Sequence, residues 1–165
     1  MRKNLITMLL STLFVSQSWA TSTPEQIKTL FVFNFIKYIE WESKPETYTI
    51  GYFGENDELF KSFSEMAQSK SIGNTKIVVK KINQASEALN FHMVYIPESK
   101  SALLEQMPEV KNTVIVTEKE GLAKKGSFIN FISQEGKIRF EVNKAKFSAS
   151  NVKISGQLLS LAIRV

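Results

Sequence analysis

The sequence predicts an α/β fold: a mainly parallel sheet with helices on both faces and an antiparallel C-terminal hairpin at the edge. Three observations predict it. A capped, strongly apolar helix comes first, strand-like and helix-like segments then alternate between residues 48 and 117, and two strand-like runs flank a Gln-Glu-Gly turn near the C-terminus. Alternating strands and helices are typical of a parallel sheet that is covered on both faces. Two strand-like runs around a glycine-containing turn indicate a hairpin.

The first twenty residues have the three-part pattern of a secretory signal peptide. Arg2 and Lys3 supply the charged start, residues 5–15 are mostly apolar, and Ala20 ends a small-residue motif. We expect cleavage after Ala20 and a single domain over residues 21–165. The alternative is a buried helix or an uncleaved anchor, although the apolar run is shorter than the roughly 20 residues that a bilayer span needs.

The composition excludes several kinds of chemistry. The chain has no cysteine, which removes thiol catalysis, thiolate metal sites and disulfide-based redox sensing. The formal charge of +5 is mild, and the basic residues are scattered along the chain. A nucleic-acid interface needs a denser basic patch with stacking aromatics, so we expect no nucleic-acid partner.

The first helix is expected to run from Pro24 to Trp41. Thr23 and Gln26 form the Thr-x-x-Gln pattern of a capping box, and proline suits the first helical position. Helical spacing predicts one buried stripe, formed by Ile27, Leu30, Phe31, Phe35 and Tyr38. Further apolar residues widen this surface, so the helix needs cover on more than one side.

The later elements follow from periodicity and from turn residues. Runs rich in apolar and β-branched residues predict strands at 48–54, 76–82, 91–96 and 112–117. Helical spacing predicts helices at 58–70, 85–89, 99–107, 143–150 and 155–164. The hairpin is expected to pair 127–132 with 137–142.

A candidate ligand-binding group comprises Gly54, Asn56, Asp57 and His92. The first three follow the first strand and open a helix, where ligands bind in open α/β sheets. An acidic cap at a helix start is the ordinary structural interpretation of the same residues. The segment lacks the glycine pattern and the lysine of phosphate-binding loops.

His92 is the only histidine, and we place it next to the carboxyl ends of the strands. One histidine without carboxylates at ligand spacing does not form a metal site, so no metal is expected. No nucleophile elbow of the Gly-x-Ser-x-Gly type accompanies it, so no catalytic residues are expected. A hydrogen-bonded structural histidine is the alternative to a functional one.

A candidate partner-binding group comprises Asn34, Tyr38 and Trp41 on the first helix. Asn34, Lys37 and Glu40 form a narrow polar seam on an otherwise apolar helix. Aromatic residues at helical spacing pack in a core, but they are also favoured in binding hot spots. The seam therefore marks either a polar contact inside the fold or a face that docks a partner or a second copy of the chain.

The chain resembles the YfiR-like periplasmic proteins. The resemblance lies in residues 30–41, 50–54, 91–96 and 140–143, and in the Ile-Ser-Gly-Gln-Leu-Leu-Ser-Leu-Ala run of residues 154–162. Many relatives carry a cysteine where Phe91 stands, so disulfide-dependent control is not expected here. Gly126-Ser127 also replaces the more usual Gly-Gly before the hairpin.

This resemblance implies a non-enzymatic periplasmic regulator without a cofactor. The implied partner is an inner-membrane sensor protein, a diguanylate cyclase or a histidine kinase, and restraint of a cyclase would lower cyclic di-GMP and biofilm formation. Two other classes stay open. One is a periplasmic small-ligand-binding module that serves a sensor kinase or a transport system, and the other is a hydrolase, against which the missing set of catalytic residues counts.

Overall fold

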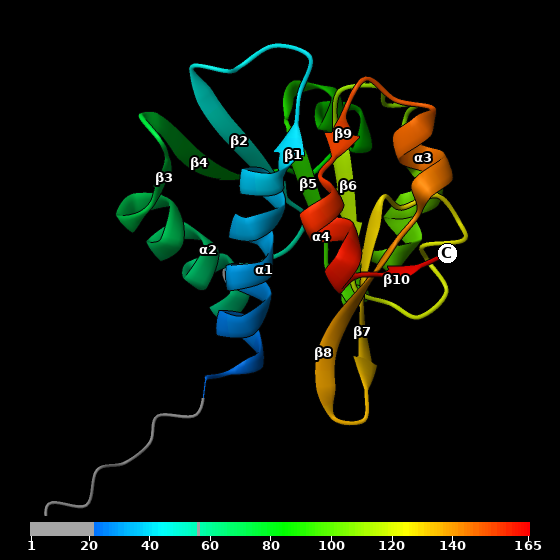
Figure 1. Ribbon diagram of the computed structural model, residues 1–165. Coiled ribbons are helices and arrows are strands. Elements are labelled where there is room, and N and C mark those ends of the chain that lie inside the picture. Colours follow the sequence, from blue (N-terminus) through cyan, green and yellow to red (C-terminus); the bar gives the residue numbers. More distant parts are fainter. Residues whose placement is uncertain (1–21, 56) are drawn as a thin grey trace, which may run out of the picture.

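The structure, a computed structural model, describes residues 22–55 and 57–165 (Figure 1). The predicted signal peptide, its cleavage point after Ala20 and the predicted ligand residue Asn56 lie outside the described residues. The helices are α1 (Pro24–Tyr38), α2 (Glu58–Ser69), α3 (Lys144–Ser148) and α4 (Gly156–Leu161), with the 3-10 helices η1 (Ala85–Asn90) and η2 (Glu98–Gln106). The strands are β1 (Ile39–Glu40), β2 (Thr47–Tyr52), β3 (Ser71–Ile72), β4 (Thr75–Lys81), β5 (Met93–Ile96), β6 (Val114–Thr117), β7 (Ile129–Gln134), β8 (Lys137–Val142), β9 (Lys153–Ile154) and β10 (Ile163–Arg164).

Within the described part of the chain, eight strands form one sheet in the order β10-β8-β7-β6-β5-β2-β4-β3. The five adjacent strands β7, β6, β5, β2 and β4 are mutually parallel. The hairpin pairs β7 and β8 in antiparallel register around Glu135 and Gly136, which both have positive φ. These pairings confirm the predicted α/β class. The two-residue strand β10 extends the sheet beyond β8.

The order of the strands reverses between β2 and β5. From β2 the chain crosses to β4 on one side, whereas from β5 it continues to β6 on the other side. In open α/β sheets, ligands bind outside the carboxyl ends of the two strands that flank such a switch point. Here those ends are the residues that follow Tyr52 and Ile96.

Helices cover both faces of the sheet, as predicted. Helices α1 and α2 pack side by side on one face, and α4 lies next to α1, in front of the sheet in Figure 1. On this face, Phe35 of α1 lies between Phe131 and Phe140, with ring centroids 5.6 Å and 5.0 Å away. Phe63 of α2 packs against Tyr95, at 5.1 Å. The 3-10 helices lie behind the sheet in the same view.

Helix α1 starts as predicted and ends earlier than predicted. The hydroxyl of Thr23 accepts a hydrogen bond from the Gln26 amide at 3.3 Å, and the Gln26 side chain accepts one from the Thr23 amide at 3.1 Å. At the other end the backbone becomes extended at Ile39, which pairs with Ile154 in the antiparallel β1–β9 sheet. Strand pairing by a β-branched residue therefore overrides the helical periodicity, and Trp41 lies outside the helix.

The expected buried stripe of α1 was also partly wrong. The buried residues are Thr29, Val32, Phe35 and Ile36, whereas Leu30 is 51% exposed. The stripe is shifted because α1 contacts both α2 and the β7–β8 hairpin. The Thr29 hydroxyl lies in the first of these contacts, 2.9 Å from the Ser62 hydroxyl of α2, and is 2.7 Å from the Glu25 carbonyl of its own helix.

Replacing Phe35 with alanine should lower the free energy of unfolding by about 3–5 kcal/mol, because a fully buried ring would leave a cavity. Urea denaturation followed by tryptophan fluorescence measures this change. Lys37→Ala, on the exposed side of the same helix, is the matched control and should change stability by less than about 0.5 kcal/mol. Equal effects of the two substitutions would contradict the packing of α1.

Candidate functional site

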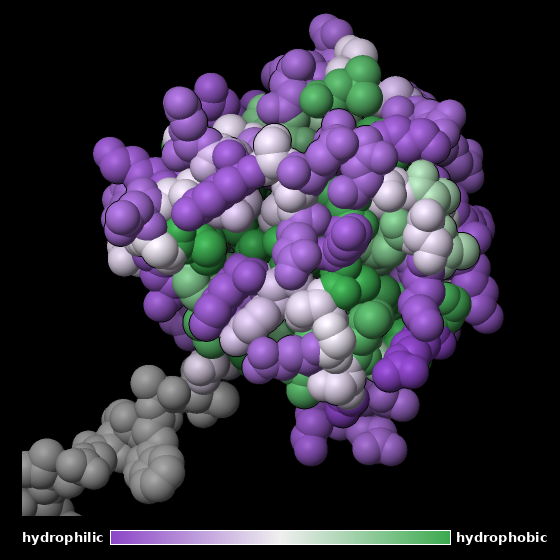
Figure 2. All heavy atoms as spheres, turned by 45° about the horizontal axis from the view of Figure 1, so that its top comes forward, coloured by the Kyte–Doolittle hydropathy of each residue, from purple (hydrophilic) through white to green (hydrophobic). Residues whose placement is uncertain are grey.

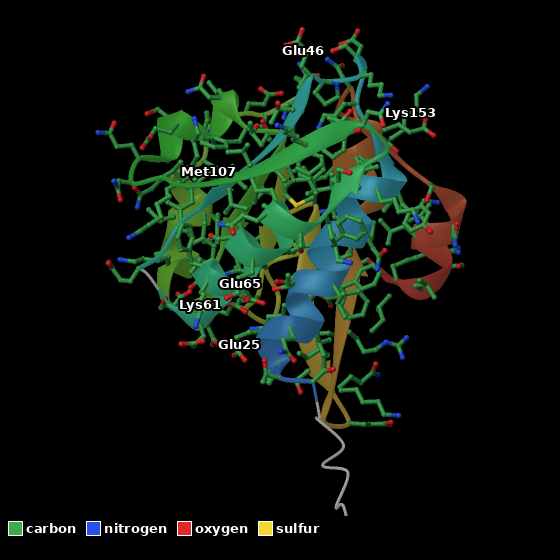
Figure 3. The ribbon with its side chains drawn as sticks, turned by 90° about the vertical axis from the view of Figure 1, so that its left-hand side faces the viewer. Glu25, Glu46, Lys61, Glu65, Met107 and Lys153 are labelled. Atoms are coloured by element: carbon green, nitrogen blue, oxygen red, sulfur yellow. The ribbon has the colours of Figure 1, made fainter. Side chains whose placement is uncertain are left out.

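The candidate site residues gather at the two opposite ends of the parallel strands. Figure 3 places Glu46, in the loop between β1 and β2, at one end of the molecule and Glu25, in the first turn of α1, at the other. The carboxyl ends of β2 and β5 lie toward Glu25, and their amino ends lie toward Glu46. We describe the two ends in turn.

An open crevice of about 670 Å³ lies at the carboxyl ends, at the switch point between β2 and β5. It is lined by Glu25, Lys28, Tyr52, Asp57, Glu58, Leu59, Pro97, Glu98, Ser99 and Glu118. Five of these side chains are carboxylates and one is an ammonium group. The crevice therefore presents carboxylate oxygens that suit a cationic or hydrogen-bond-donating group.

Two buried tyrosines lie at this crevice: Tyr52 lines it, and Tyr95 lies behind Tyr52 and contacts the lining residue Glu118. The rings of Tyr52 and Tyr95 stack with centroids 5.7 Å apart. Tyr52 donates its phenolic hydrogen to Asp57 at 2.6 Å, and Tyr95 donates to Glu118 at 3.0 Å. Burial raises the pKa of both phenols, and the neighbouring carboxylates raise it further. Both tyrosines therefore stay neutral donors at ordinary pH.

Glu118 joins several elements at the edge of the crevice. One of its oxygens accepts from Tyr95 and forms an ion pair with Lys28 of α1. The other accepts a hydrogen bond from the Glu98 amide, at the start of η2, at 3.1 Å. This carboxylate therefore holds α1, β5 and η2 together. The sequence analysis missed Glu118 and the two tyrosines, although Glu118 directly follows a predicted strand and could have been found by that position.

The predicted residues after β2 lie close to this crevice. Asp57 lines it and also caps α2, since its second oxygen accepts a hydrogen bond from the Phe60 amide at 2.8 Å. Gly54 lines a smaller hollow of about 160 Å³ beside it. A Cβ atom on Gly54 would lie 2.3 Å from the Tyr52 ring, so only glycine fits there without displacing that ring. Structural and site-lining roles thus coincide in this segment.

His92 does not join Gly54 and Asp57, which corrects its expected place. Strand β5 starts at Met93, so His92 precedes the strand and lies at its amino end. Its Nδ1 atom accepts a hydrogen bond from the Thr49 amide at 3.2 Å and lies 2.9 Å from the Thr49 hydroxyl. Burial lowers the pKa of His92, in agreement with a neutral ring that accepts from a backbone amide.

Instead, His92 belongs to an aromatic cluster with Trp41 and Tyr48. The three ring centroids lie 5.4–5.8 Å from one another. The Trp41 indole donates to the Asn112 carbonyl at 3.0 Å, which fixes the ring. Beside the cluster is a pocket of about 210 Å³, lined by Trp41, Glu42, Ser43, Leu89, Asn90, Phe91, His92 and Asn112.

The other predicted partner-binding residues lie on α1, before this cluster. Tyr38 is half-buried, and the ammonium group of Lys37 lies 5.0 Å from its ring centroid. Its carbonyl accepts a hydrogen bond from the Ser155 amide at 3.0 Å, next to β9. Asn34 lies one helical turn earlier and is partly exposed. The structure therefore brings Trp41 and His92 into contact, and leaves Asn34 and Tyr38 along the helix that leads to them.

No group of three or more potential metal-ligating side chains was found among residues 22–55 and 57–165. In the same residues, no helix has the length and apolar character that crossing a bilayer requires.

A family model described as YfiR/HmsC-like matches residues 25–163, nearly all of the described chain. The chain belongs to the YfiR/HmsC-like family. This is a family of periplasmic regulators, and the match confirms the resemblance seen in the sequence. No curated protein matches the chain significantly in sequence.

A solved structure has a similar fold. It is a conserved domain protein from Vibrio cholerae O1 biovar El Tor, with a TM-score of 0.52 and 11% sequence identity. The match covers 86% of this chain and 60% of the Vibrio chain, so this YfiR/HmsC-like chain spans less than two thirds of that protein. At this identity the likeness concerns the fold alone.

Folding stability should fall as the pH drops below the ordinary histidine pKa of 6.5, in part through His92. Because the fold lowers the pKa of this ring, the stabilisation is present above 6.5 and is lost as the pH falls through the lower, folded value. Urea denaturation at pH 7.5 and at pH 5 measures the loss. His92→Asn keeps a hydrogen-bond acceptor near the Nδ1 position and should show a smaller loss. An equal loss in both proteins would contradict a contribution from His92, whose pKa burial lowers.

Proposed function

We propose that this chain is a non-enzymatic periplasmic regulator that binds the periplasmic part of an inner-membrane diguanylate cyclase and restrains its output. Lower cyclase output would reduce cyclic di-GMP and biofilm formation. The observation that carries the proposal is the YfiR/HmsC-like match over residues 25–163. Export through a signal peptide cleaved after Ala20 would deliver the chain to this compartment.

The surface around Trp41 supports a docking role. The indole ring is half-buried, and its contacts with Asn112 and Tyr48 hold it in one orientation. An aromatic side chain that is already ordered loses little conformational entropy on binding, which favours it as an anchor. Leu89, in the wall of the adjacent pocket, is 58% exposed and offers further apolar contact.

The visible surface favours recognition through such anchors. Figure 2 shows a largely hydrophilic face on which hydrophobic residues gather in small, separate patches. Stable complexes bury a few well-packed anchor residues at their centre, surrounded by polar contacts. We therefore expect Trp41 to lie at the centre of the interface, with Tyr38 and Asn34 toward its rim.

Restraint requires that the chain distinguish two states of the cyclase. A bound protein shifts a conformational equilibrium only by the difference between its affinities for the two states. The proposed regulator therefore binds the inactive periplasmic conformation more tightly than the active one. A stimulus that weakens this binding would release the enzyme.

The crevice at the carboxyl ends favours a second candidate function. A hollow of about 670 Å³ at a switch point, lined by Asp57 and Glu118, is the usual location of a ligand site in an open α/β sheet. In this alternative the chain is a small-ligand-binding module that serves a sensor kinase or a transport system. Binding of a ligand and regulation of a membrane partner are separated by the experiment below.

The test is crosslinking of the exported chain to inner-membrane proteins in intact cells, followed by mass spectrometry of the purified adducts. We expect a protein with a periplasmic domain and a cytoplasmic diguanylate cyclase domain, together with a mature N-terminus at Thr21. Recovery of a histidine kinase or a transporter component instead would favour the alternative. Recovery of no membrane signalling protein under several growth conditions would overturn the regulator.

Trp41→Ala should weaken capture of this partner about ten-fold or more, since hot-spot aromatics contribute about 2 kcal/mol or more. The matched control is Lys137→Ala, an exposed residue in the β7–β8 hairpin, which should leave capture unchanged. Circular dichroism should show that both variants fold. Normal capture by a folded Trp41→Ala variant would remove this residue from the interface.

A further inference from the structure

Strand β4 has an outer edge that the sheet leaves largely uncovered. Within the described ranges its one outer neighbour is β3, which pairs Ile72 with Thr75 and Ser71 with Lys76. Residues 77–81 pair with β2 on the inner side and have no strand on the outer side among the described residues. Figure 3 faces this side, and the green ribbon of β4 crosses the front of the view. An open edge of five residues is long enough to accept another strand.

The backbone groups of this edge point outward at alternate residues. Ile72 and Thr75 close the two-residue β3–β4 turn, so the peptide groups of Thr75 point outward. Because these groups alternate along a strand, the N–H and C=O groups of Ile77, Val79 and Lys81 also point outward. The N–H and C=O groups of the residues between them point toward β2. The Ile82 amide agrees with this phase, because it donates inward to the Tyr52 carbonyl at 3.0 Å. Three N–H donors and three carbonyl acceptors are thus available in register.

Positive charge surrounds these groups. Lys76, Lys80 and Lys81 on β4 and Lys70 before β3 are all exposed. No acidic residue occurs from residue 66 to residue 86. The two ion pairs found in the described residues, Lys28–Glu118 and Lys111–Glu109, involve none of these lysines. Lys76 and Lys80 therefore place positive charge on β4 with no acidic residue nearby in sequence and no ion pair among the described residues. The ammonium groups of Lys70 and Lys81 add positive charge toward the helices, 5.3 Å from the Phe33 ring and 6.0 Å from the Phe60 ring.

The positive charge near β4 determines which kind of strand can pair with its open edge. Lysines on an edge strand oppose pairing with a like edge, so a second copy of β4 would bring like charges together. An acidic strand would instead place its carboxylates beside the lysines while its backbone pairs with the open edge. Half-buried Val78 and Val79 offer apolar contact between the charges.

We propose that the β4 edge binds an extended acidic segment of a partner protein by strand addition. The occupant forms a further strand next to Ile77, Val79 and Lys81 and continues the sheet where β3 ends. That the partner is a membrane signalling protein rests on the function proposed above, whereas the binding chemistry of the edge does not. The site is distinct from the Trp41 cluster, which lies at the amino ends of the strands.

The probe is a six-residue peptide, acetylated and amidated, that alternates glutamate with valine and carries a fluorophore. We expect it to bind the mature chain at least ten-fold more tightly than a peptide that alternates lysine with valine. Raising the salt concentration should weaken the binding, because it depends on charge. A version methylated at alternate amide nitrogens, on the side that faces β4, should bind at least ten-fold more weakly. Equal binding of the acidic and basic peptides, or no binding of either, would overturn the proposal.

Two variants of the chain locate the peptide. Val79→Pro removes one outward amide and keeps the inward pairing with β2, as edge strands tolerate, and should reduce binding at least ten-fold. If circular dichroism shows that this variant does not fold, Lys80→Glu replaces it. This substitution reverses one positive charge on β4 and should likewise reduce binding of the acidic peptide. Lys137→Glu, in the β7–β8 hairpin, is the matched control and should bind normally. Loss of binding in the control but not in the β4 variants would place the peptide elsewhere and overturn the proposal.

Sedimentation and membrane capture separate the remaining outcomes. A dimer that Val79→Pro dissociates would show that a second copy occupies the edge, contrary to the proposal. Capture of a membrane partner without any peptide binding would refute strand addition and leave the regulator intact. Peptide binding without any captured signalling protein would refute the regulator and leave the edge as a binding site.

Discussion

The fold depends on the contact between the first helix and the last third of the chain. Phe31 and Phe35 of α1 pack against Phe131 and Phe140 of the β7–β8 hairpin, with ring centroids 5.0–5.9 Å apart. The end of the helix is held in the same way, because β1 pairs with β9 near the C-terminus. These contacts bury one side of α1 and fix the position at which the helix ends, three residues before Trp41.

The fold class could be predicted from the sequence, whereas several boundaries could not. Apolar and β-branched runs separated by turn residues located the strands of the central sheet, and the capping box located the start of α1. Helical periodicity placed the end of α1 three residues too late, because no local feature of Ile39 indicates that it will pair with Ile154. The two-residue strands β1, β9 and β10 depend in the same way on residues distant in sequence, and no local pattern indicates them.

The candidate sites depend on which end of a strand each residue occupies. His92 comes at the start of the predicted strand 91–96 and just before the observed β5, so it lies at the amino ends of the parallel strands, whereas Asp57 follows β2 at the carboxyl ends. The stacked Tyr52 and Tyr95 were read only as strand residues, since pairing across two strands is invisible in one segment. The two ends of the sheet now carry different chemistry, with carboxylates at one end and aromatic rings at the other.

The pairing of β1 with β9 has a consequence for how the chain matures. Residue 39 meets residue 154, so the register of the small sheet is set only when almost the whole chain is present. During synthesis from the amino terminus, Phe31 and Phe35 of α1 lack their contacts with the β7–β8 hairpin until that hairpin has been made. Contacts so distant in sequence slow folding. Loss of the last dozen residues would therefore remove Ile154 and strand β10, and would leave β1 without its full pairing partner.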